Sequence, residues 1–153
     1  MALTCGNLRN LLSDTNRPEE AERYYREALE IYQRLAEANP AAYEPDLANI
    51  CNNLAYLFIV ADKMEVPVSP EQIAKAEPYL QEALKIYQRY AAANHKAYKS
   101  DVAIALYNWG VLEYKRNQPD AARPYFEKAR AIFEEYPHCA KEVQQCRDAL
   151  ARL

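Results

Sequence analysis

Three asparagines occupy matching places in the chain, and their amide groups are its clearest candidates for recognition chemistry. Asn7, Asn53 and Asn108 each directly precede a large apolar residue. A side-chain amide carries a donor and an acceptor together, so it can pair with one peptide unit of a ligand whatever the ligand's side chains are. Three such amides on one face would form a row that holds an extended backbone. In the alternative interpretation, the same amides bond neighbouring helices or water.

The residue types that usually carry catalysis or metal binding are present but are not grouped for either role. The four cysteines are scattered along the chain, at Cys5, Cys51, Cys139 and Cys146. His95 and His138 each lack further ligands at metal-binding spacing, and the sequence has no glycine-rich phosphate loop. We therefore expect no enzymatic activity, no metal and no cofactor. We interpret the cysteines as reduced thiols that pack between helices.

The composition favours one soluble domain that binds neither nucleic acid nor membranes. A chain of 153 residues can bury a continuous core. Its formal net charge of −3 does not indicate a general nucleic-acid or membrane-surface binder. No stretch approaches the roughly 20 apolar residues that a membrane span needs. Residues 1–12 also lack the basic lead and apolar run of a signal peptide. We expect a cytoplasmic protein.

An internal repeat dominates the sequence. Residues 21–46, moved forward by 55 positions, coincide with residues 76–101 at 16 of 26 positions. A weaker third copy begins 46 residues later, at Ala122. Repeats of this period are the sequence signature of solenoids, in which each unit buries its apolar face against its neighbours.

Apolar residues recur three and four positions apart, which predicts seven helices and no strand. The predicted helices span about residues 2–14, 18–39, 45–63, 70–94, 101–116, 119–136 and 138–153. Prolines open several of them, at the position where a missing N–H costs nothing. Ser69 followed by Gln72 predicts a capping box. The last helix is rich in charged and amide side chains, as expected for the polar cap of an array.

The spacing within each predicted helix pair resembles that of the tetratricopeptide repeat (TPR) family. In that family, a large and then a small residue on the first helix precede a pattern on the second helix. The pattern is an alanine twelve residues after the small residue, a large apolar or aromatic residue four further on, and an alanine three beyond that. Here Trp109 and Gly110 are followed at this spacing by Ala122, Phe126 and Ala129. The pattern indicates close helix contact, because small residues let two helices approach.

The other two pairs depart from the family spacing in one respect each. Leu54 and Ala55 are followed by the same pattern only after nine extra residues, which predicts an inserted loop at 62–70. The residues that complete this second pattern are Ala76, Leu80 and Ala83. In the first pair, Leu8 is followed by Arg9 instead of a small residue, so this pair is atypical.

The resemblance implies an all-α, right-handed α-solenoid of about three antiparallel helix pairs and a C-terminal capping helix. It covers the whole chain as a single TPR-like domain, residues 1–153. The implied pairs span about residues 1–39, 45–94 and 100–136, with the cap at 138–153. The repeat is longer than is usual in the family, so the helices are expected to be elongated, similar to those of kinesin light chain-type repeats.

In TPR arrays the first helices of the pairs line a concave face, and the resemblance therefore implies a groove there. The candidate peptide-binding residues are Asn7, Asn49, Asn52, Asn53, Tyr56, Tyr107, Asn108, Val111, Tyr114 and Lys115. The tyrosines would supply contact area at a low entropic cost. Lys115 is the single basic residue in this set, so capture of a carboxylate by a basic cluster is not expected.

The function that the resemblance implies is a non-catalytic scaffold that binds another protein or an extended peptide in this groove, with no nucleic acid or membrane as partner. The alternative is a structural or self-assembling element, or a fragment of a longer array. In that alternative, weak self-association is expected through the apolar N-terminal helix.

Overall fold

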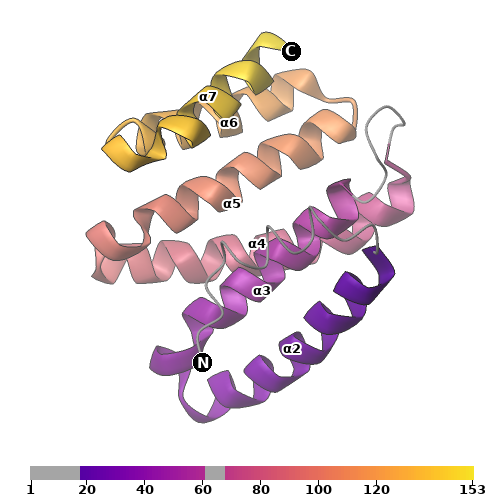
Figure 1. Cartoon of the computed structure of the whole chain (residues 1–153), viewed down its shortest axis with the longest axis vertical. Helices are drawn as coiled ribbons and strands as arrows, with labels where there is room; N and C mark the ends of the chain where they lie inside the picture. Colours follow the sequence, from indigo (N-terminus) through magenta and orange to yellow (C-terminus); the bar gives the residue numbers. More distant parts are fainter. Residues whose placement is uncertain (1–17, 61–67) are drawn as a thin grey trace.

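In the computed structural model, the chain is a row of helices that follow one another along the long axis of the molecule (Figure 1). The structure describes residues 18–60 and 68–153. Its elements are α2 (Pro18–Ala38), α3 (Pro40–Val60), α4 (Pro70–Ala93), α5 (His95–Lys115), α6 (Pro119–Phe133), the short 3-10 helix η1 (Pro137–Cys139) and α7 (Ala140–Ala151). These residues contain no strand, and each α-helix packs against the next. This confirms the predicted all-α solenoid of helix pairs.

Two parts of the prediction lie outside the described residues. The predicted helix at 2–14 falls within 1–17, and most of the predicted insert at 62–70 falls within 61–67. Beyond the insert, the start of α4 is as predicted. The hydroxyl of Ser69 accepts a hydrogen bond from the N–H of Gln72, and Pro70 occupies the first helical position.

The predicted starts of α3 and α5 are wrong. Each helix begins earlier than predicted, α3 at Pro40 instead of residue 45 and α5 at His95 instead of residue 101. The cause is an asparagine cap that recurs in the repeat, 55 residues apart. The side-chain oxygen of Asn39 accepts from the N–H of Ala42, and that of Asn94 accepts from the N–H of Ala97. His95 is therefore the first residue of a helix.

These caps make the connections between helix pairs very short. Asn94 alone separates α4 from α5, and its N–H still donates to the carbonyl of Tyr90 at 2.8 Å. At the other end of the chain, α6 stops at Phe133, before the predicted 136, and η1 then leads into α7. Residue 137 is a proline, which cannot continue a helix ladder.

The small residues of the predicted TPR pattern lie in the core. Ala55, Ala76, Ala83, Ala122 and Ala129 are fully buried. Where α5 crosses α6, Gly110 of α5 lies so close to α6 that an added Cβ would be 2.8 Å from Cε1 of Phe126. The predicted close contacts between helices are thereby confirmed.

Asp101 of α5 is partly buried, and this burial raises the pKa of its carboxyl group from 3.8 to about 6. Because the folded state then binds a proton that the unfolded chain releases, stability falls as the pH rises from about 4 to about 6 and stays lower above that range. We expect Asp101→Asn to raise the free energy of unfolding at pH 7 by about 1 kcal/mol, a value discounted for the carboxylate's partial solvent contact.

Urea unfolding of this variant at pH 4 and at pH 7 checks that expectation, since little change is expected at pH 4. Asp46, the exposed counterpart 55 residues earlier, is the control. Asp46→Asn should change stability by less than about 0.5 kcal/mol at either pH. Destabilisation by Asp101→Asn at pH 7 would contradict the burial argument.

Candidate peptide-binding face

The first helices of consecutive pairs, α3 and α5, pack directly on each other. A hydrogen bond between two buried amides joins them: Nδ2 of Asn108 donates to Oδ1 of Asn52 at 3.0 Å. The two side chains are 1% and 4% exposed, respectively. A ligand at the surface would therefore not reach either amide without a rearrangement, which favours the structural interpretation for these two residues.

The other amides of α3 form a second pair. Asn49 and Asn53 are one helical turn apart, and Nδ2 of Asn53 donates to Oδ1 of Asn49 at 2.9 Å. Both residues are half-buried. Asn7 lies outside the described residues. Hence the four candidate asparagines within the described residues form two hydrogen-bonded pairs. Binding of a ligand's backbone by Asn49 and Asn53 stays a prediction.

In the structure, Asn108 is hydrogen-bonded to Asn52. The row predicted from the sequence instead placed Asn108 in line with Asn53. Asn53 and Asn108 occupy equivalent repeat positions, 55 residues apart, but equivalent residues do not face each other in a stack. Each first helix turns one side towards the preceding pair and another side towards the following pair. The contact across the stack therefore joins two different repeat positions, and the sequence alignment of the copies carried no signal for it.

The aromatic and apolar candidates lie on the same two helices, α3 and α5, and differ in exposure. Tyr56 of α3 and Tyr107 and Val111 of α5 are half-buried, whereas Tyr114 is 40% exposed. Val60, at the end of α3, is also 40% exposed. We define the α3–α5 face as the half-buried or exposed residues Asn49, Asn53, Tyr56, Val60, Val111, Tyr114 and Lys115. Tyr107 also packs inward, with its ring 5.4 Å from that of Phe126.

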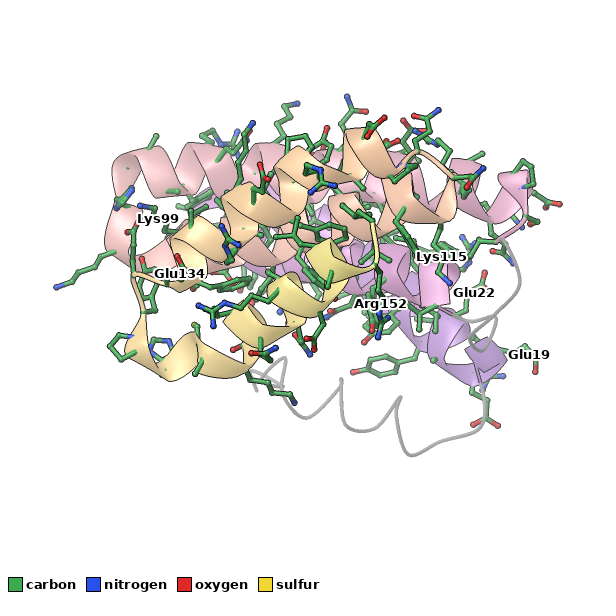
Figure 2. The ribbon with its side chains drawn as sticks, turned by 90° about the horizontal axis from the view of Figure 1, so that it is seen from above. Glu19, Glu22, Lys99, Lys115, Glu134 and Arg152 are labelled. Carbon is green, nitrogen blue, oxygen red and sulfur yellow. The ribbon has the colours of Figure 1, made fainter. Side chains whose placement is uncertain are left out.

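Two of the three lysines of α5, Lys99 and Lys115, lie towards opposite ends of the helix (Figure 2). Lys99 is neutralised by Glu135, with its Nζ 2.7 Å from both carboxylate oxygens. Lys115 forms no ion pair with a residue of the described chain, so it brings one uncompensated positive charge to the end of the α3–α5 face.

Cys51 and Cys146 lack the environment of a reactive thiolate, and the described chain holds no cluster of metal ligands. Burial raises the pKa of Cys51 to about 12 and that of Cys146 to about 11, so both remain thiols at neutral pH. Within 18–60 and 68–153, no three histidine, cysteine or carboxylate side chains come together as metal ligands. Likewise, none of the described helices combines the length and hydrophobicity needed to span a membrane.

The buried amide pair provides a stability prediction. Asn108→Ala should lower the free energy of unfolding by about 2 kcal/mol, because it leaves the buried amide of Asn52 without its donor. In the Asn108→Ala variant, Asn52→Ala should lower the free energy of unfolding by less than it does in the parent chain. A double-mutant cycle measured by urea unfolding should give a coupling energy of about 1 kcal/mol. The same cycle on the half-buried Asn49 and Asn53 is the control and should give a smaller coupling. Additive costs for Asn52 and Asn108 would show that their bond stabilises nothing.

Antiparallel helix pairs with small residues at their crossings define the class of α-helical repeat proteins. Two family models, both described as tetratricopeptide repeat, match the chain, one over residues 71–135 and the other over residues 1–41. Together they cover more than half of it, and the chain belongs to the TPR family. Repeats of this family act in general as scaffolds for protein interactions. Comparison with curated proteins and with solved structures gave no match.

Proposed function

We propose that this chain binds a segment of another protein on the α3–α5 face, without catalysis. The observation that carries the proposal is that Val60 and Tyr114, both exposed, lie near the C-terminal ends of two helices that pack directly on each other. Exposed apolar side chains on adjoining elements form a patch that gains free energy when a partner removes it from water.

The amide pair gives the same face a polar contact. Nδ2 of Asn53 has a second hydrogen beyond the one that it donates to Oδ1 of Asn49. A carbonyl group of a ligand that lies across α3 could accept this hydrogen without breaking the existing bond. The chemistry favours a segment with apolar side chains that rest on Tyr114 and Val60 and with a backbone group that reaches the amides.

The test is a peptide library screened against the full chain, followed by affinity measurement on variants of the face. Tyr114→Ala and Val60→Ser should each weaken the selected peptide at least about tenfold, since central apolar contacts in an interface are worth more than about 1 kcal/mol. The matched control is Tyr24→Ala, because Tyr24 is 45% exposed but lies on α2. Equal losses in the control and in Tyr114→Ala, or no loss in either, would refute this location.

Asn53→Ala separates the two roles of the amide pair. If Asn53 contacts the ligand, this variant should lose less affinity than Tyr114→Ala does, and its thermal stability should be unchanged. The alternative function, self-assembly, predicts an oligomer in light scattering of the chain alone. The exposed side of α7 argues against stacking on that helix, because most of its exposed residues are polar or charged: Lys141, Gln144, Arg147 and Asp148.

A further inference from the structure

The last helix, α7, is attached to the described chain mainly through α6. It lies along α6 at one end of the row of helices (Figure 1), and the elements that pack closely against it are α6 and η1. By contrast, α5 packs against α3, α4 and α6. A helix with one large neighbour removes less apolar surface from water, so its docking contributes less to stability.

The burial beneath α7 is correspondingly small. Cys146 is the one buried residue among the 12 of α7, whereas α5 buries eight of its 21 residues. Cys139 of η1, which is 6% exposed, and the half-buried Val143 add to the apolar contact. A thiol is a small apolar group, so it gains less from burial than a leucine or phenylalanine side chain would.

Near α7, α6 carries an arginine where the other copies of the repeat have leucines. Arg130 corresponds to Leu84 of α4 and Leu29 of α2. Burial raises the pKa of Cys146 to about 11, and the nearby charge of Arg130 opposes that rise. Nε of Arg130 is itself buried, yet it has no hydrogen-bond partner in the part of the chain that the structure describes. A buried donor of this kind makes the contact less favourable, because it has lost water without gaining an acceptor.

The ion pairs between α6 and α7 are also weak. Glu134 of α6 is 3.7 Å from Nε of Arg130 and 3.5 Å from Nη2 of Arg147 on α7, so one carboxylate serves two guanidinium groups. The three side chains are between 38% and 57% exposed, and ion pairs this exposed contribute little. A helix of 12 residues is too short to persist alone, so α7 also regains conformational freedom when it leaves α6.

We propose that α7 is a detachable cap, which leaves α6 while α2 to α6 stay folded and thereby makes Cys139 and Cys146 available for modification by soft electrophiles. In the closed state both thiols are buried. In the open state they meet water, form thiolates and become nucleophiles. Local openings cost less free energy than unfolding of the whole chain, and they involve elements with few buried apolar contacts. The proposal does not depend on ligand binding at the α3–α5 face.

The test is site-resolved labelling of the full chain with N-ethylmaleimide, whose C=C double bond takes up the thiolate and a proton without a leaving group. Cys5 lies outside the described residues, and we replace it by serine in every protein. Each rate, measured by mass spectrometry, is divided by the rate in the urea-unfolded chain. Cys139 and Cys146 should react at least about tenfold faster than Cys51, the control thiol, which is 3% exposed in α3.

Asn108→Ala separates the release of α7 from unfolding of the whole chain. This change weakens the contact between α3 and α5, so it should speed labelling of Cys51 at least about tenfold. It should leave labelling of Cys146 within about twofold, because α7 opens independently. If Asn108→Ala speeds both thiols by the same factor, or if Cys146 of the parent reacts no faster than Cys51, α7 opens only with the rest of the chain and the proposal is overturned.

Arg130→Leu tests the cause of the release. Leucine restores the apolar residue of the other copies and removes the buried donor, so labelling of Cys146 should slow about tenfold. Lys128→Ala, at an exposed position of α6, is the matched control and should leave that rate within about twofold. An unchanged rate in Arg130→Leu, or an equal change in Lys128→Ala, would also overturn the proposal.

Discussion

Gly110→Ala is expected to destabilise the protein by about 2 kcal/mol, although the same change stabilises most helices. Alanine gains about 1 kcal/mol of helix propensity over glycine. The new methyl group, however, would lie 2.8, 2.9 and 3.1 Å from three ring atoms of Phe126. Phe126 is 2% exposed, so its ring cannot turn away into solvent. Overfilling a rigid core contact of this kind costs about 3 kcal/mol, and the clash therefore outweighs the propensity.

Urea unfolding of three further variants separates these two contributions. Ala74→Gly, at an exposed position of α4, measures the propensity term alone and should cost about 1 kcal/mol. Phe126→Leu makes room beside α5, so Gly110→Ala should be less harmful in that background than in the parent. If Gly110→Ala stabilises the parent chain, α5 and α6 can separate without cost, and the close crossing is not a constraint on this fold.

The crossing at Gly110 also explains why the pairing of helices could be predicted from the sequence. Gly110 and Ala122 are only twelve residues apart, so the large and small residues that fix one helix hairpin stand in one short stretch. Each hairpin buries its own apolar side, and the apolar spacing reports that burial directly. The match between residues 21–46 and 76–101 then extends one hairpin to an array.

The starts of α3 and α5 could not be predicted in the same way, because two local signals compete there. Pro45 was interpreted as the first residue of a helix, whereas it lies inside α3. The stronger signals are the caps at Asn39 and Asn94, each followed by a helix with no intervening loop. The sequence contains both signals, a proline that could open a helix and an asparagine that could cap one. Only the packing of α3 and α5 against their neighbours decides where each helix begins.

The candidate binding face shows a second limit of the sequence. The residue types of the face were found, since Tyr114 and Val111 follow from their position on α5. The bond between Asn52 and Asn108 depends on how consecutive hairpins are staggered, and that stagger is set by contacts between residues 56 positions apart. The spacing of residues within one hairpin does not predict this stagger.

Arg116→Ala is expected to lower the free energy of unfolding by about 3 kcal/mol. Arg116 is the C-cap of α5 and bonds to two carboxylates, with Nη1 2.9 Å from Oε1 of Glu113 and Nη2 2.7 Å from Oε2 of Glu77 on α4. Glu113 is only 7% exposed. Removing the guanidinium would leave a buried carboxylate without its positive partner, which is far more costly than losing an ion pair in water.

Two comparisons isolate the buried charge as the cause of that loss. Arg89→Ala removes a guanidinium that pairs with Glu44 at the surface, where Arg89 is 59% exposed, and it should cost less than about 1 kcal/mol. Glu113→Gln should recover part of the loss when it is added to Arg116→Ala, because a neutral amide is less costly to bury than an unpaired carboxylate. Thermal and urea unfolding measure all four proteins. If Arg116→Ala costs no more than Arg89→Ala, or if Glu113→Gln recovers nothing, Glu113 reaches water in the folded chain and Arg116 does not hold α5 to α4.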